Sequence, residues 1–130
     1  MNFYIGSGFQ NKEQVQFVRD QLIQRGFIHT YDWTENERAA SKEALVEIGQ
    51  KEKDGVYEAD LVVILLPGGK GTHIELGMAL ALNKTIILYA PNREVEDFTK
   101  TSTFYHLPEI QYSDSLDEVI SKTIDLKRGE

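Results

Sequence analysis

Blocks of apolar and polar residues alternate along the chain in lengths that suit strands and helices in turn. Short β-rich runs occupy Phe3 to Ile5 and Phe27 to Trp33, and continuous apolar runs occupy Leu61 to Leu66 and Thr85 to Tyr89. A further short strand is expected near Ile110 to Tyr112. Continuous apolar runs are typical of parallel strands that are buried on both faces.

Between these runs, apolar residues recur at helical spacing. The predicted helices are one that carries Val15, Val18 and Leu22, a long polar helix over Glu35 to Glu58, an Ala- and Leu-rich helix over Thr72 to Asn83, and a last helix near Leu116 to Leu126. Residues 92–108 show no clear pattern and are expected to include surface loop. Strands that alternate with helices predict βαβ units and right-handed crossovers. The predicted fold class is therefore α/β, a three-layer flavodoxin-like sandwich around a mostly parallel five-stranded sheet, with the first and third strands adjacent.

The composition is that of an ordinary soluble globular protein. The chain has 130 residues, of which 41% are apolar and 27% charged, so we expect residues 1–130 to form a single domain. It contains no cysteine, which excludes a disulfide framework, a thiolate nucleophile and a Cys-ligated metal. The three histidines show no metal-ligand spacing. We therefore expect neither a metal nor another cofactor.

Charge and hydropathy limit the partners. The formal net charge is −7, which argues against a nucleic-acid duplex, because phosphate contacts need clustered Lys and Arg. The longest apolar run, Leu61 to Leu66, is much shorter than the roughly 20 residues that span a bilayer, and the start of the chain lacks the pattern of a signal peptide. We expect a cytoplasmic protein that binds a small molecule and not a membrane.

Two glycine-containing loops follow predicted strands, Gly6-Ser7-Gly8 and Gly68-Gly69-Lys70-Gly71. Ligands of parallel sheets bind at the carboxyl ends of the strands, so these loops should face each other across one crevice. The second loop enters a helix, whose free N–H groups and dipole favour an anion, but it does not match the Walker pattern Gly-x4-Gly-Lys-Ser/Thr. A tight turn without a ligand explains the loop equally well. The predicted substrate-binding residues are Gly6, Ser7, Gly8, Trp33, Gly68, Gly69, Lys70, Gly71 and Thr72; for Trp33, base stacking competes with a core position.

Glu75 has a structural and a chemical interpretation. In the first, Thr72 is the helix N-cap and Glu75 completes a capping box, worth about 1 kcal/mol. In the second, a carboxylate in the first helical turn stays ionised beside the crevice and acts as a nucleophile on an electron-poor carbon. The spacing by itself favours the cap.

Two segments resemble the nucleoside 2-deoxyribosyltransferases and the related 2'-deoxynucleoside 5'-phosphate N-hydrolases. The first is the opening strand Phe3-Tyr4-Ile5 with its Gly6-Ser7-Gly8 turn. The second is the strand from Ala59-Asp60-Leu61, followed by Glu75-Leu76-Gly77-Met78-Ala79, which is similar to that family's Glu-Leu-Gly-x-Ala helix. The resemblance covers most of the first 90 residues.

The resemblance implies cleavage or transfer at the N-glycosidic bond of a (deoxy)nucleoside or nucleoside monophosphate. Glu75 would attack the anomeric carbon and form a covalent glycosyl-enzyme, as in retaining glycosidases. Tyr4 would orient the Glu75 carboxylate. Asp60 matches an acidic residue before the family's third strand, although a turn residue at the strand edge is an equal explanation. Relatives of this type also imply a homo-oligomer, a dimer or higher, in which a neighbour's carboxyl-terminal segment helps to close the site.

The sequence departs from that family just before the nucleophile. The transferases have an acidic residue there that handles the base, whereas this chain has Gly68-Gly69-Lys70. The stretch Pro67 to Glu75 instead resembles the Pro-Gly-Gly-x-Gly-Thr-x-x-Glu motif of the cytokinin-activating phosphoribohydrolases, which also cleave an N-glycosidic bond. Glycine in place of the carboxylate leaves room for a phosphate and favours a nucleotide substrate.

Two alternatives stay open from the sequence. One is a non-catalytic nucleotide-binding or signalling module that kept the crevice. The other is a Toll/interleukin-receptor-like hydrolase that cleaves the ribosyl bond of NAD. The identity of the base, and whether water or a second base accepts the sugar, are not encoded in any pattern described above.

Overall fold

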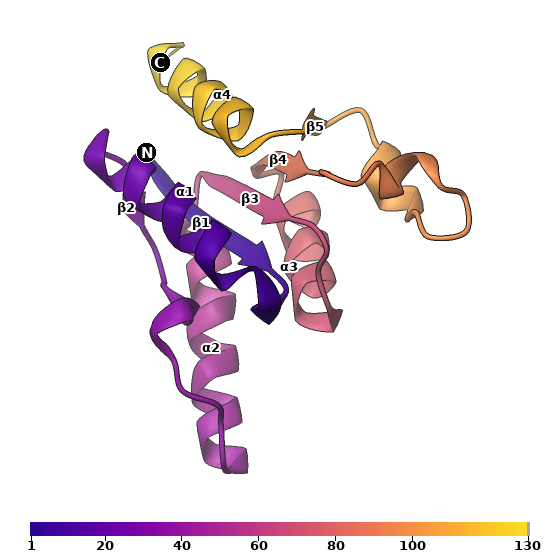
Figure 1. Ribbon diagram of the computed structural model, residues 1–130. Helices are drawn as coiled ribbons and strands as arrows, with labels where there is room; N and C mark the ends of the chain where they lie inside the picture. Colours follow the sequence, from indigo (N-terminus) through magenta and orange to yellow (C-terminus); the bar gives the residue numbers. More distant parts are fainter. Residues whose placement is uncertain (130) are drawn as a thin grey trace.

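The computed structural model describes residues 1–129, so Glu130, the last residue of the predicted domain, lies outside the described residues. Five strands form one sheet in the order β2-β1-β3-β4-β5, and every neighbouring pair is parallel (Figure 1). The strands are β1 (Asn2–Ser7), β2 (Ile28–His29), β3 (Leu61–Leu65), β4 (Thr85–Tyr89) and β5 (Ile110–Ser113). The predicted fold class and the adjacency of the first and third strands are confirmed, and the sheet is parallel throughout.

Helices cover both faces of the sheet and complete the three layers (Figure 1). Helices α1 and α4 contact each other on one face, and α2 and α3 contact each other on the opposite face. The helices are α1 (Lys12–Gln24), α2 (Lys42–Glu58), α3 (Lys70–Ala81) and α4 (Leu116–Arg128). No helix within residues 1–129 is long and apolar enough to cross a membrane.

The core is built around β1 and β3. All five residues of β3 are fully buried, as the continuous apolar run predicts for a central parallel strand. Tyr4 of β1 lies opposite Val62 of β3, and Ser7 lies opposite Leu65. This register brings the carboxyl ends of the two strands to one edge of the sheet, where the loops that follow them meet.

The predicted strand over Phe27 to Trp33 is wrong for most of its length, because only Ile28–His29 pairs with β1. The Asp32 side chain accepts a hydrogen bond from the backbone N–H of Thr34 at 3.0 Å. This local bond bends the chain into a short 3-10 helix, η2 (Trp33–Glu35), which strand propensity does not detect.

The long polar helix also starts later than predicted. It begins at Lys42 and not at Glu35, because the Ser41 hydroxyl caps it by accepting the N–H of Ala44 at 3.1 Å. The ambiguous residues 92–108 are mostly loop, as expected, with two short 3-10 helices, η3 (Glu94–Glu96) and η4 (Thr103–His106).

The glycine-loop helix α3 begins two residues earlier than predicted. Its N-cap is Gly69, so Thr72 lies inside the first turn and Glu75 in the second. The capping-box interpretation of Glu75 is therefore wrong, and the carboxyl group is free to serve another partner.

Candidate active site

Glu75 and Tyr4 form a buried pair at the centre of the sheet's carboxyl edge. The Tyr4 hydroxyl donates a hydrogen bond to Oε2 of Glu75 at 2.5 Å. Tyr4 has no exposed surface, and Glu75 is 7% exposed. Burial and the neighbouring carboxyl raise the pKa of Tyr4, so its hydroxyl keeps the proton that it donates. The proximity of the two side chains, predicted from the family resemblance, is present.

A second carboxyl group, from Glu52 on α2, reaches Glu75. Burial raises the pKa of Glu75 to about 8. The charge and hydrogen bond of Glu52 also raise this pKa, whereas the hydrogen bond from Tyr4 lowers it. Burial likewise raises the pKa of Glu52. Two carboxyl groups in hydrogen-bonding reach cannot both ionise easily, which favours a state in which the pair shares one proton. Burial therefore opposes the ionised state predicted for Glu75.

A cavity of about 230 Å³ opens in front of this pair. The lining residues are Ser7, Gly8, Phe9, Trp33, Glu52, Gly69, Gly71, Thr72 and Glu75. The two glycine-containing loops face each other across it, and Gly8 N–H donates to the Pro67 carbonyl at 3.2 Å, as the strand-end argument predicts. The Ser7 hydroxyl donates to the Leu65 carbonyl at 2.7 Å, so its proton already has a partner.

Several predicted residues lie outside the lining of this cavity. Gly6 packs behind it, where a Cβ would stand 2.9 Å from Oε1 of Glu75. Gly68 packs against Thr72, and Lys70 is exposed at the start of α3. These residues shape or flank the loop and do not touch the cavity in this structure.

The position of Asp60 argues against its predicted catalytic role. Asp60 precedes β3 and therefore lies at the amino end of the sheet, opposite the edge that carries Glu75. Its carboxylate accepts the backbone N–H of Asn2 at 2.8 Å. Asp60 holds the start of β1 to β3, which is the strand-edge role considered as its alternative.

A second cavity of about 450 Å³ adjoins the first. Its lining residues are Phe9, Trp33, Asn36, Glu37, Arg38, Ala39, Ile48 and Glu52, so the two cavities share Phe9, Trp33 and Glu52. The Trp33 indole N–H donates to the Ile5 carbonyl at 2.7 Å, which fixes the ring while it borders both cavities. Phe9 and Trp33 lie with ring centroids 6.3 Å apart. Aromatic walls beside a polar pair suit a flat heterocyclic base.

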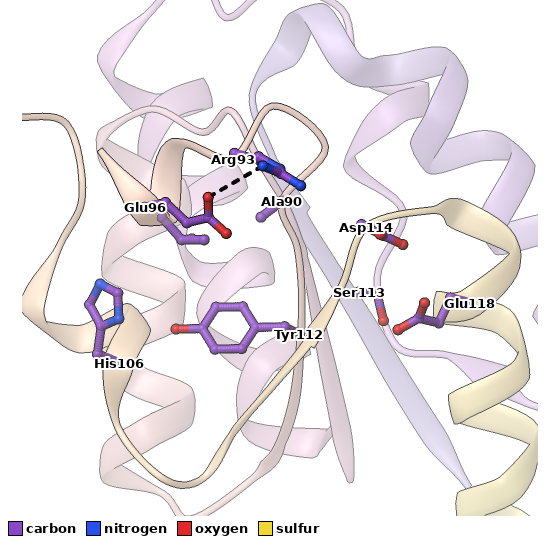
Figure 2. Close-up of a pocket in the computed structure, with 9 residues that line it drawn as sticks. Ala90, Arg93, Glu96, His106, Tyr112, Ser113, Asp114 and Glu118 are labelled. Atoms are coloured by element: carbon purple, nitrogen blue, oxygen red, sulfur yellow. Dashed lines mark ion pairs between the residues drawn. The ribbon is translucent and has the colours of Figure 1, made fainter. Parts of the chain in front are cut away.

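A separate cavity of about 490 Å³ lies past the ends of β4 and β5, where Figure 2 shows Arg93 and Glu96 above Tyr112 and His106. Arg93 and Glu96 are mostly exposed and only 3.9 Å apart, a weak surface ion pair. None of the predicted site residues lines this cavity, so we place the candidate active site at Glu75.

Sequence reasoning missed Glu52 and Phe9. Glu52 lies four residues from Ile48 and from Val56, so it interrupts the apolar stripe of α2. A carboxyl group at an apolar-stripe position was the signal that could have found it. Phe9 gave no such signal, because an aromatic residue after a turn is common in cores; here it is 64% exposed.

The parallel α/β sheet thus carries a buried Tyr–Glu pair and a second carboxyl group beside a cavity at its carboxyl edge, an arrangement that suits an enzyme. The family comparison makes this specific: the model for nucleoside 2-deoxyribosyltransferase matches residues 3–104, so the chain belongs to that family. It is therefore an enzyme of N-glycosidic bond cleavage or transfer on nucleosides or nucleotides.

Solved structures share the fold over almost the whole chain. A CMP N-glycosidase, BcmB, from Clostridium botulinum is 21% identical, with a TM-score of 0.66 over 98% of this chain and 99% of the other. A 2-deoxyribosyltransferase from Leishmania mexicana is 17% identical, with a TM-score of 0.67 over 95% of this chain and 97% of the other. No curated protein sequence matches.

Proposed function

We propose that Glu75 is the nucleophile in the cleavage of a 2'-deoxynucleoside 5'-monophosphate. The observation that carries this proposal is the buried Tyr4–Glu75 hydrogen bond of 2.5 Å at the wall of the cavity. Tyr4 keeps one carboxylate oxygen in place, so the other can face the anomeric carbon. A positioned carboxylate attacking an oxocarbenium-like centre is the chemistry of retaining glycosidases.

Glu52 carries the proton in this scheme. When substrate binds, the shared proton resides on Glu52 and Glu75 is ionised. The bond from C1' to the base nitrogen breaks, a bond from C1' to a Glu75 oxygen forms, and Glu52 gives its proton to the departing base. Water, or a second base, then attacks C1' and gives a proton to Glu52, which releases Glu75. Glu52 thus replaces the carboxyl group that the sequence lacks before Glu75.

The shapes of the two cavities support a nucleotide substrate. The smaller cavity has Gly69, Gly71 and Thr72 at the start of α3, where free N–H groups and the helix dipole favour a phosphate. The larger cavity has Phe9 and Trp33 for the base. The likeness to a CMP N-glycosidase makes CMP and dCMP the first nucleotides to test.

The proposal is tested by base release, followed by chromatography, from dCMP, CMP, deoxycytidine and NAD. We expect release from dCMP, and a mass increase of one deoxyribosyl phosphate on Glu75 in rapidly quenched samples. Glu75→Ala should abolish release while the fold survives. Release that is unchanged in Glu75→Ala would refute the nucleophile, and cleavage of NAD alone would favour the Toll/interleukin-receptor-like alternative.

The proton role of Glu52 has its own test. Glu52→Gln should lower kcat about 10²- to 10⁴-fold for a natural base, since general-acid catalysis contributes that much. The loss should shrink for a synthetic leaving group that departs without a proton. Glu47→Gln is the matched control, because Glu47 lies on the same helix and its side chain is 69% exposed. Equal losses for both leaving groups would contradict the role.

Domain organisation, assembly and location belong to the same proposal. Residues 1–130 form one domain, two or more copies associate, and the enzyme works in the cytoplasm, where nucleoside monophosphates are found. Support for association comes from the open cavities and from the family's use of a neighbouring chain. Sedimentation velocity tests the assembly, and a monomer at working concentration with full activity would refute it.

A further inference from the structure

His73 is held at both ring nitrogens. Its Nδ1 lies 2.8 Å from the Gly69 carbonyl oxygen, and its Nε2 lies 2.6 Å from the Tyr105 hydroxyl. Tyr105 belongs to η4, 32 residues further along the chain, and is 3% exposed. Neither side chain lines the two cavities at Glu75. The pair therefore connects the segment between β4 and β5 to the glycine loop without touching the candidate ligand space.

The partners decide which nitrogen of the ring carries the hydrogen. A carbonyl oxygen only accepts, so Nδ1 is the donor to Gly69. In the neutral ring Nε2 then accepts from the Tyr105 hydroxyl. The same Gly69 carbonyl also accepts the backbone N–H of His73 at 3.2 Å. Two donors of one residue thus hold a single carbonyl group of the loop.

Backbone hydrogen bonds hold the two ends of the glycine loop, since the Pro67 carbonyl accepts from Gly8 N–H and the Gly69 carbonyl accepts from His73 N–H. Gly68, Gly69 and Gly71 have the widest backbone freedom of any residue type, which makes their ordering costly. No atom lies within 4 Å of the position that a Cβ would take at Gly69 or Gly71, so side-chain packing does not fix them. The His73 side chain adds a hydrogen bond at the Gly69–Lys70 peptide, which joins the loop to α3.

We infer that His73, supported by Tyr105, is a positioning residue that orients the Gly69–Lys70 peptide for the ligand's phosphate. In a trans peptide the C=O and N–H point in opposite directions. Holding the Gly69 carbonyl towards His73 therefore turns the N–H of Lys70 away from it, towards the open start of α3. This inference rests on the proposed function only in that the ligand carries a phosphate. His73 and Tyr105 would order the loop from outside the two cavities at Glu75.

The expected effect falls on binding of the phosphate and not on bond cleavage. His73→Ala should raise the KM for dCMP about 10-fold, the equivalent of roughly one charge-assisted hydrogen bond, with kcat within about 2-fold. Tyr105→Phe should raise KM less, about 3-fold, because the Gly69 contact stays. The inhibition constant of inorganic phosphate should rise in parallel, whereas that of deoxycytidine should not change.

Two variants separate positioning from a general structural role. His73→Asn can place its amide nitrogen near the Nδ1 position, donate to Gly69 and restore most of the phosphate affinity. Ile74→Ala is the matched control on the same helical turn, since Ile74 is 65% exposed. A change in kcat as large as that in KM, an equal loss for deoxycytidine, or no recovery in His73→Asn would each overturn the inference.

Amide hydrogen exchange gives a readout that needs no turnover. Relative to its intrinsic rate, exchange of the residue 73 N–H, which donates to the Gly69 carbonyl, should be faster in His73→Ala than in the parent or in Ile74→Ala. Unchanged exchange overturns the inference even if dCMP is cleaved. If the parent enzyme releases no base from any nucleotide, the proposed function fails, while faster exchange and weaker phosphate binding in His73→Ala would still support the inference.

Discussion

Glu75→Gln tests the buried carboxyl pair through stability and not through turnover. The amide has nearly the shape of the carboxyl group. Its oxygen can accept the Tyr4 hydroxyl hydrogen bond, and its nitrogen can donate to Glu52. The substitution therefore removes the ionisation of Glu75 and little else. Any difference from the parent protein that depends on pH then reports the cost of ionising this group inside the fold.

The magnitude follows from the pKa of Glu75. Its ordinary value of 4.5 rises to about 8 in the folded protein, mainly through burial. Each pKa unit corresponds to about 1.4 kcal/mol, so the folded state loses up to about 5 kcal/mol when Glu75 must ionise. A raised folded-state pKa means that this stability is present below pH 4.5 and is lost as pH rises through 8. The variant has no such loss.

Urea unfolding at pH 5, 7 and 9 measures the effect. Glu75→Gln should be close to the parent in stability at pH 5 and more stable at pH 9, by several kcal/mol up to that limit of about 5. Activity should be absent at every pH. A stability difference that is the same at pH 5 and pH 9 would refute the reasoning, because it would mean that Glu75 ionises as easily in the fold as in the unfolded chain.

Three further predictions concern glycines beside the site and a histidine on β2. Gly55→Ala should destabilise the fold by about 1–3 kcal/mol and lower kcat, because its Cβ would stand 3.0 Å from the Tyr4 ring. Gly49→Ala, on the same helix, meets open space and should stabilise the fold by about 0.5–1 kcal/mol. Thermal unfolding and kinetics compare the two variants, and equal effects would contradict this prediction. Gly6→Ala should cost about 10²-fold in kcat, since its Cβ would displace the nucleophilic carboxylate; unchanged kinetics would count against it. Burial lowers the pKa of His29 from 6.5 to about 4, so neutral His29 contributes about 3 kcal/mol to the free energy of unfolding above pH 6.5, and this is lost as pH falls towards 4. In His29→Phe the free energy of unfolding in urea should therefore change less with pH over that range. The same decline in the variant as in the parent protein would exclude the effect.

The sequence predicts the parts of this molecule that local pattern controls. The continuous apolar runs at Leu61 and Thr85 define the central strands, and glycine after a strand marks the ligand edge. Propensity and spacing fail where a single side chain or cap redirects the backbone. The Asp32 carboxylate ends a strand that β-propensity would continue. An N-cap at Gly69 supersedes the capping box expected at Thr72.

The candidate site divides in the same way. The contact between Tyr4 and Glu75 could be predicted because a family motif fixes both residues. Glu52 gives a sequence signal only as a carboxyl group on the apolar stripe of α2, and its contact with Glu75, 23 positions further on, could not be predicted. Only the packing of α2 on α3 brings the two carboxyl groups together, and no local rule encodes that packing.

The division of the ligand space into two adjoining cavities has a consequence for how such an enzyme can diversify. Residues 36–39 line only the larger cavity, on a segment that precedes α2 and lies apart from the nucleophile. Substitutions at those four positions can change the shape of the base-binding cavity while Tyr4, Glu52 and Glu75 keep their arrangement. Grafting this short stretch between homologues is therefore a direct route to altered base selectivity, with the reaction itself conserved.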